Sequence, residues 1–167
     1  MLAYRIVNTK SGEFEGRISL LEGGLAYLFP ELEGVSLRIR MKKLRGSVAE
    51  YDHRSLRIDI DPRHFEQDAN NLLPSVLAHE TMHAVQHIDR RVPYGERSCD
   101  VYTLARLPDE FFPRIKDFYV KVPQKVLSRQ PGLIRETANK AIQLRAMGMR
   151  NYIVWFEKEL EKISRAN

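Results

Sequence analysis

The chain has 167 residues, a formal net charge of +5 at pH 7, and one cysteine. A single cysteine excludes an intrachain disulfide framework, and no stretch approaches the ~20 apolar residues that a membrane-spanning helix needs. The first residues also lack an apolar run of signal-peptide length, so we expect a cytoplasmic protein that forms one domain over residues 1–167 and does not bind membranes.

The N-terminal part of the chain predicts one helix followed by a small sheet. Apolar residues recur at helical spacing over 13–29, and Pro30 ends the pattern. Over 35–44, apolar side chains alternate with arginine and lysine, which is typical of a strand with one buried face. Two further strands are predicted at 46–51 and 55–60.

Residues 71–90 predict a long helix, with Asn70 or Asn71 as its cap. This helix contains a His-Glu-x-x-His motif at residues 79–83. Histidines four apart lie one above the other on a helix, so both rings can reach one zinc ion. At ~100° per residue they fall opposite the apolar side of the helix, which comprises Leu73, Leu77, Ala84, Val85 and Ile88.

Glu80 lies between the two histidines, beside the metal rather than on it, where it can take a proton from a water molecule. His87 continues the four-residue spacing of His79 and His83. Eight residues of helix rise ~12 Å, however, which is too far for His79 and His87 to share one zinc ion at ~2.0–2.1 Å. We therefore interpret His87 as a residue of the cleft edge, a residue on the substrate side, or a solvated side chain.

A second helix is predicted at 96–105, after a short turn. Glu96 and Asp100 are four apart and share one stripe of this helix. The short turn lets the helix fold back and bring a carboxylate to the two histidines. A catalytic zinc usually has three protein ligands and an open position, so either carboxylate can be the third ligand. Cys99 lies in the same helix and is interpreted as a packed thiol.

The remainder of the chain predicts helices. One runs from Pro131 toward Met147, and an apolar stripe over 149–163 indicates another. From Lys121 onward there are ten basic residues against four acidic ones. This excess is typical of solvated helix faces, with nucleic-acid binding as the alternative. An aromatic cluster is expected in the core and comprises Phe111, Phe112, Ile115, Phe118 and Tyr119.

The motif at 79–83 followed by Glu96-x-x-x-Asp100 resembles the gluzincin metallopeptidases, in particular the small single-domain minigluzincins. The resemblance covers about residues 71–107. It implies an α+β, zincin-like fold with an N-terminal helix, a small mostly antiparallel or mixed sheet, an active-site helix and a glutamate helix. The catalytic core would span about 1–107, with a helical C-terminal extension over about 108–167.

The same resemblance implies a zinc metalloendopeptidase. His79, His83 and Glu96 would bind Zn²⁺, and Asp100 would orient His79. Glu80 would act as general base and then as general acid. Tyr94 stands where related enzymes place a transition-state donor, with Tyr102 and His87 as rivals. The strand at 46–51 would pair with an extended peptide or protein substrate.

Two other classes of protein remain open. A non-hydrolytic or latent zinc-binding module would use the same ligands in a blocked cleft, for example under the C-terminal helices. A nucleic-acid-associated protein, as among the SprT-like peptidases, would use those basic helices for binding. SprT-like peptidases have a third histidine downstream, whereas no histidine follows His87 in this chain.

Overall fold

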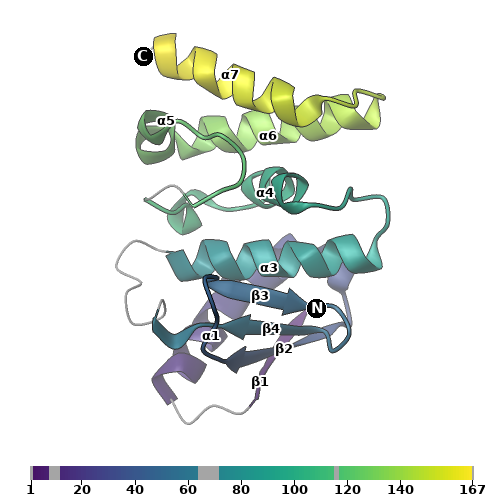
Figure 1. Ribbon diagram of the computed structural model, residues 1–167, viewed down its shortest axis with the longest axis vertical. Coiled ribbons are helices and arrows are strands. Elements are labelled where there is room, and N and C mark those ends of the chain that lie inside the picture. Colours follow the sequence, from purple (N-terminus) through teal and green to yellow (C-terminus); the bar gives the residue numbers. More distant parts are fainter. Residues whose placement is uncertain (1, 8–11, 64–71, 115–116, 167) are drawn as a thin grey trace. The chain divides into compact units, whose positions relative to one another are not determined.

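A computed structural model describes residues 2–7, 12–63, 72–114 and 117–166 (Figure 1). The chain divides into two compact units. The first unit comprises residues 1–69 and 76–92, and the second comprises residues 70–75 and 93–167. The expected cap at Asn70 or Asn71, and Ile115 of the expected aromatic cluster, lie outside the described residues. No helix in the described part is long and apolar enough to span a membrane.

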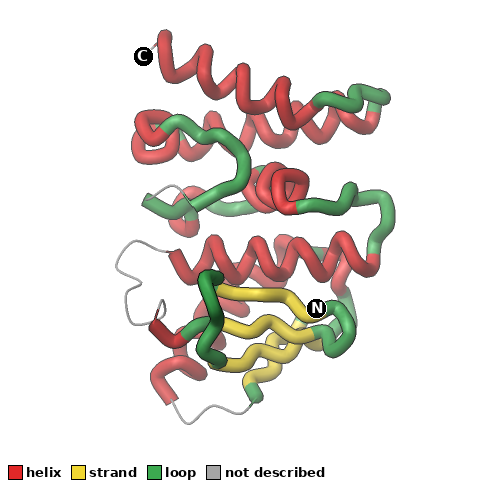
Figure 2. Tube along the Cα trace, in the orientation of Figure 1, coloured by secondary structure: helices red, strands yellow, loops and turns green. Residues whose placement is uncertain are grey.

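The first unit contains a mixed four-stranded sheet in the order β1-β2-β4-β3 (Figure 2). Strand β2 pairs in parallel with β1 and with β4, whereas β3 pairs antiparallel with β4. β1 and β3 are therefore the edge strands. The strands span Ala3–Ile6 (β1), Ser36–Met41 (β2), Ala49–Asp52 (β3) and Arg57–Ile60 (β4).

Three of the four strands match the predicted ones, and the prediction of a mixed sheet in an α+β protein is confirmed. The four-residue strand β1 was not predicted. β4 begins at Arg57, two residues later than expected, because Leu56 adopts φ 47°, a left-handed conformation outside the strand region. The buried face alternates as expected, with Leu37, Ile39 and Ile58 completely buried.

Helix α1 (Gly12–Leu25) contacts β1 and adds Phe14, Ile18 and Leu25 to the core of the first unit. The expected helix at 13–29 ends four residues too late. After Leu25 the backbone forms two short 3₁₀ turns, η1 (Ala26–Leu28) and η2 (Pro30–Leu32). Such turns often follow a helix because they satisfy its last carbonyl groups.

Helix α3 (Leu72–Ile88) carries the histidine motif and is tied to β1 by a buried hydrogen bond. The hydroxyl of Thr81 donates to the carbonyl of Leu77 over 2.7 Å, which leaves its oxygen to accept from the Tyr4 hydroxyl at 2.8 Å. Burial raises the pKa of Tyr4 well above its usual range, so the phenol keeps its proton. The bond fixes how α3 is rotated about its axis relative to β1.

The expected apolar side of α3 is buried except at its end. Leu73, Leu77, Ala84 and Val85 are at most 4% exposed. Ile88 is 43% exposed, so its assignment to the buried side was wrong. It is the last residue of the helix, where the chain leaves the core.

The face of the sheet opposite Leu37, Ile39 and Ile58 is polar. The carboxylate of Asp59 lies at its centre, and this residue is 3% exposed. Arg40 donates to both Asp59 oxygens at 3.0 and 2.9 Å, Arg57 donates at 2.8 Å, and Lys42 donates at 3.3 Å. Burial raises the pKa of Asp59, but these three cations outweigh it and hold the pKa below its usual value. One carboxylate therefore crosslinks β2 and β4.

The second unit is helical. Helix α6 (Pro131–Ala146) lies between α4 (Glu96–Leu104) and α7 (Tyr152–Ala166), and it contacts both (Figure 1). The short helix α5 (Gln124–Arg129) was not predicted, and η3 (Asp109–Phe111) precedes it. Tyr152 donates a hydrogen bond to the Ser98 hydroxyl at 2.9 Å, which joins α7 to α4.

The predicted apolar stripe of the last helix is confirmed by Tyr152, Phe156 and Leu160, which are all buried. The expected aromatic core is correct for Phe112, which is 5% exposed. It is wrong for Tyr119, which is 64% exposed. The backbone amide of Tyr119 donates a hydrogen bond that holds this segment, as described below.

Replacing Asp59 by Asn is expected to lower the free energy of unfolding by about 1–3 kcal/mol at neutral pH, because three donors lose a charged acceptor. Since folding lowers the pKa of Asp59, its contribution is present above the unfolded pKa of ~3.9 and is lost as the pH falls through the folded pKa. Asp59→Asn should therefore weaken the acid dependence of stability. Urea unfolding from neutral pH down to acid measures both effects.

Glu161→Gln is the matched control, because Glu161 pairs with Arg165 on the surface of α7 and both side chains are more than half exposed. Glu161→Gln should change the free energy of unfolding by no more than about 0.5 kcal/mol. Equal losses of stability in the two variants would contradict the role given to Asp59.

Candidate metal centre

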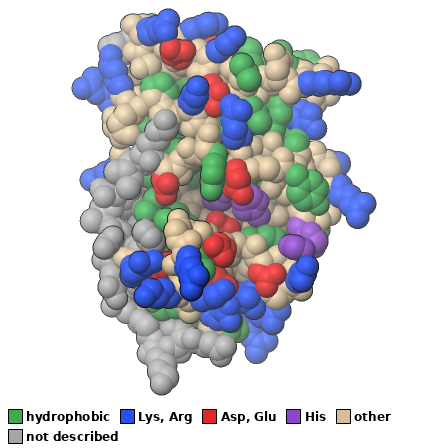
Figure 3. Space-filling model, viewed as in Figure 1, with side chains coloured by type: hydrophobic (Ala, Val, Ile, Leu, Met, Phe, Trp, Pro, Cys, Tyr) green, Lys and Arg blue, Asp and Glu red, His purple; other side chains and the backbone are tan. Residues whose placement is uncertain are grey.

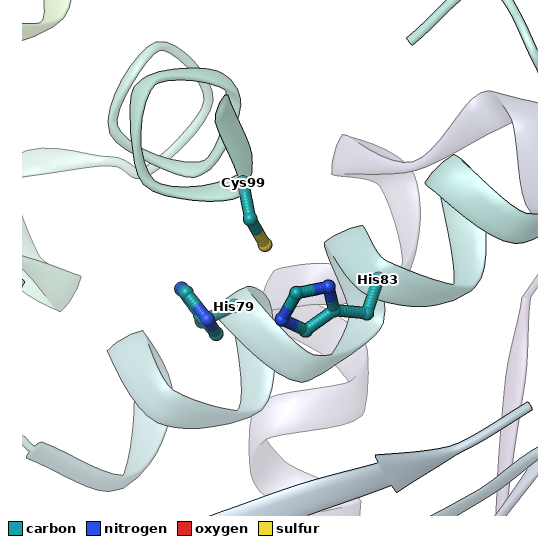
Figure 4. A group of neighbouring side chains, drawn as sticks. All are labelled: His79, His83 and Cys99. Atoms are coloured by element: carbon teal, nitrogen blue, oxygen red, sulfur yellow. The ribbon is translucent and has the colours of Figure 1, made fainter. Parts of the chain in front are cut away.

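His79 and His83 project from successive turns of α3 (Figure 4). Their ring centroids are 4.8 Å apart and their planes meet at 83°. Two imidazoles that bind one tetrahedral ion at ~2.0–2.1 Å place their centroids about 5 Å apart. The separation of the two rings therefore fits a single metal ion.

Both histidines are half-buried, and histidine side chains reach the surface drawn in Figure 3. A small ion or a substrate can approach such a site from solvent. His83 also makes a hydrogen bond within its own helix, where its Nδ1 lies 2.9 Å from Oε1 of Gln86. Gln86 is 1% exposed and was not singled out in the sequence, where it appears as an ordinary polar residue.

Glu80 is 7% exposed, although the sequence suggested only that it lies to one side of the histidines. Burying an ionised carboxylate costs free energy unless charges or hydrogen bonds compensate for the lost water. A cation held by the neighbouring histidines would be such a charge. Glu80 is thus a buried carboxyl group that stands in sequence between two half-buried histidines of α3.

His87 lies one turn beyond His83 and has a different neighbour. It is exposed, and its ring centroid lies 5.6 Å from that of His53 in the turn between β3 and β4. Its exposure agrees with the interpretation as a solvated side chain.

In the second unit, α4 carries the residues expected to complete the site. Glu96 is exposed in the first turn, and Asp100 is completely buried. One Asp100 oxygen, Oδ2, accepts hydrogen bonds from the backbone amides of Tyr119 at 2.6 Å and Val120 at 2.9 Å. This carboxylate thus anchors a loop 20 residues away in sequence, a role that the Glu-x-x-x-Asp spacing gave no reason to expect.

Cys99 is also completely buried. Within the described part of the chain, His79, His83 and Cys99 form a group of side chains that could hold a metal ion (Figure 4). The sequence interpretation gave Cys99 only a packing role. The available signal was its position three residues after Glu96, which puts the two side chains on the same face of α4.

The tyrosines proposed as transition-state donors differ in their environments. Tyr94 is 65% exposed in the turn before α4, next to Gly95, which adopts φ 105°. Tyr102 is half-buried, and burial together with the neighbouring Tyr152 raises its pKa. Tyr102 therefore takes part in packing within the second unit, whereas Tyr94 is mostly exposed.

Tyr51, on the edge strand β3, was not considered in the sequence. Its phenol oxygen is buried and has no hydrogen-bond partner among the described residues. Burial raises the pKa of Tyr51 to about 12, with the neighbouring Asp52 adding to the effect. A buried hydroxyl without a hydrogen-bond partner is uncommon in folded proteins, and Tyr51 is such a case on β3.

Comparison with family models, curated proteins and solved structures finds no match for this chain. Kinship therefore adds nothing to the arguments about function. They rest on the chemistry and placement of the side chains described above and on the motif at residues 79–83.

Proposed function

We propose that the protein is a zinc-dependent metallopeptidase whose metal is held by His79 and His83. The observation that carries the proposal is the pair of imidazoles 4.8 Å apart, with the buried Glu80 on the same helix between them. Paired histidines suit zinc and other borderline metals, whereas Mg²⁺ and Ca²⁺ prefer oxygen ligands. The resemblance of the motif at 79–83 to gluzincins supports zinc and peptide hydrolysis.

The bound metal would supply Lewis-acid chemistry, which activates water and polarises a scissile carbonyl group. Glu80 would accept the proton of the attacking water and then donate it to the leaving nitrogen. Because Glu80 is buried, its interactions with nearby charges are screened less than they would be in bulk water. The histidines would hold and orient the metal, and Glu80 would move the proton.

The edge strand β3 supports a peptide as the substrate. An edge strand has backbone N–H and C=O groups that can pair with an extended chain. β3 lies at the edge of the sheet beside β4, and it overlaps the segment 46–51 that the resemblance assigns to substrate binding. An extended peptide added to β3 would continue the sheet of the first unit.

The third ligand would come from α4. The resemblance implies Glu96, whose side chain is exposed, with Asp100 orienting His79. Cys99 is the competing donor, because it forms a group with the two histidines and a thiolate is a common zinc ligand. Asp100 is the weakest candidate as a direct ligand, since its Oδ2 already accepts two backbone amides.

Glu80→Gln should abolish peptide hydrolysis while the protein still binds about one zinc ion, because an amide keeps the shape of the side chain but cannot accept the proton. Cleavage of a denatured protein substrate, measured beside the zinc content, checks this. Glu159→Gln, on the surface of α7, is the control and should keep full activity. A Glu80→Gln variant with wild-type activity would contradict the mechanism.

Separate alanine variants of Glu96, Cys99 and Asp100 should identify the third ligand through their zinc stoichiometry. We expect Glu96→Ala to lose the metal and Cys99→Ala to keep it. Substituting cobalt for zinc gives a second measurement, since a bound thiolate adds an intense near-ultraviolet band. Loss of metal in Cys99→Ala, together with that band in the wild type, would instead assign the sulfur.

A further inference from the structure

Gln86 is a buried polar residue in a mostly apolar part of α3. It is 1% exposed, while Met82, Ala84 and Val85 around it are completely buried apolar residues. Burying an amide without a hydrogen bond costs about 1–3 kcal/mol, so an apolar residue would fill this position more favourably. A buried amide at this position is therefore expected to have a hydrogen-bond partner.

One such partner is His83, whose Nδ1 lies 2.9 Å from Gln86 Oε1. Gln86 follows His83 by three residues, so the two side chains meet on one face of the helix. An amide oxygen can only accept a hydrogen bond, and Nδ1 must therefore carry the proton. A neutral imidazole protonated on Nδ1 has its lone pair on Nε2.

We propose that Gln86 is a positioning residue that holds His83 as the Nδ1–H tautomer and so presents the Nε2 lone pair to a metal ion. This inference rests on the proposed function and extends it to a residue outside the His-Glu-x-x-His motif. Metal-binding histidines generally need such a partner on their other ring nitrogen, which fixes both the tautomer and the ring orientation. The partner of His83 comes from its own helix.

The neutral amide also suits the charge of this region. Glu80 already places one carboxylate in the buried part of α3. A second carboxylate at position 86 would orient His83 equally well, but it would add another buried negative charge in the absence of metal. Glutamine supplies the acceptor without that charge.

The tautomer can be read directly from ¹⁵N-labelled histidine in the metal-free protein, at a pH where the imidazoles are neutral. Two-bond ¹H–¹⁵N spectra distinguish the Nδ1–H form from the Nε2–H form. Wild-type His83 should be the Nδ1–H tautomer. In Gln86→Met, which keeps the length of the side chain but removes the acceptor, His83 should shift toward the Nε2–H form that free imidazole side chains prefer.

Zinc affinity should follow the tautomer. Gln86→Met should weaken zinc binding by about 10–100-fold, the range found when such partners are removed. Gln86→Glu restores an acceptor and should recover the Nδ1–H tautomer and at least wild-type affinity. Leu77→Met, at another completely buried position of α3, is the matched control and should change neither the tautomer nor the affinity.

An Nε2–H tautomer of His83 in the wild type would overturn the inference, and this measurement needs no variant to fold. An unchanged tautomer and affinity in Gln86→Met would overturn it as well. The tautomer is measured without metal or substrate, so its outcome is separate from the peptidase test. If Gln86 sets the tautomer while the protein hydrolyses no peptide, the proposed function fails and the positioning role stands.

Discussion

The buried hydrogen bond between Tyr4 and Thr81 is the constraint on which the candidate site depends. Thr81 lies at the centre of the histidine motif, and a displacement of two residues turns a helix by ~200°. When Thr81 faces β1, His79 and His83 on either side of it must face almost directly away. The bond therefore turns both histidines out of the core of the first unit. The Thr81 hydroxyl also donates to the Leu77 carbonyl one turn earlier in α3, so the same side chain contacts both β1 and its own helix.

The polar residues buried in α3 have separate roles. Thr81 sets the rotation of the helix, Gln86 contacts one histidine, and the carboxyl group of Glu80 lies buried between the two histidines in sequence. Each of these groups is expensive to remove from water, and a helix serving only as core would use apolar residues instead. They lie within about two turns of helix around His83, and this concentration is the physical argument for a polar site in this segment.

Periodicity predicted the α+β class, three of the four strands and the main helices. The histidine helix, the alternating strand β2 and the apolar stripe of α7 all lie close to the expected boundaries. The features that were missed depend on contacts between residues far apart in sequence, or on details of a single turn. Asp100 anchors backbone amides 20 residues away, and His87 lies beside His53. The role of Gln86 depends on which of its amide atoms faces His83, which a sequence pattern does not specify.

The central claim is that one metal ion binds between His79 and His83. Crystals of the protein grown with zinc and measured on both sides of the zinc absorption edge test it most directly. The account predicts an anomalous peak at ~2.0–2.1 Å from Nε2 of His83 and from a ring nitrogen of His79. A zinc-loaded crystal with no anomalous peak between these two rings, or with zinc bound only at other residues, would contradict it.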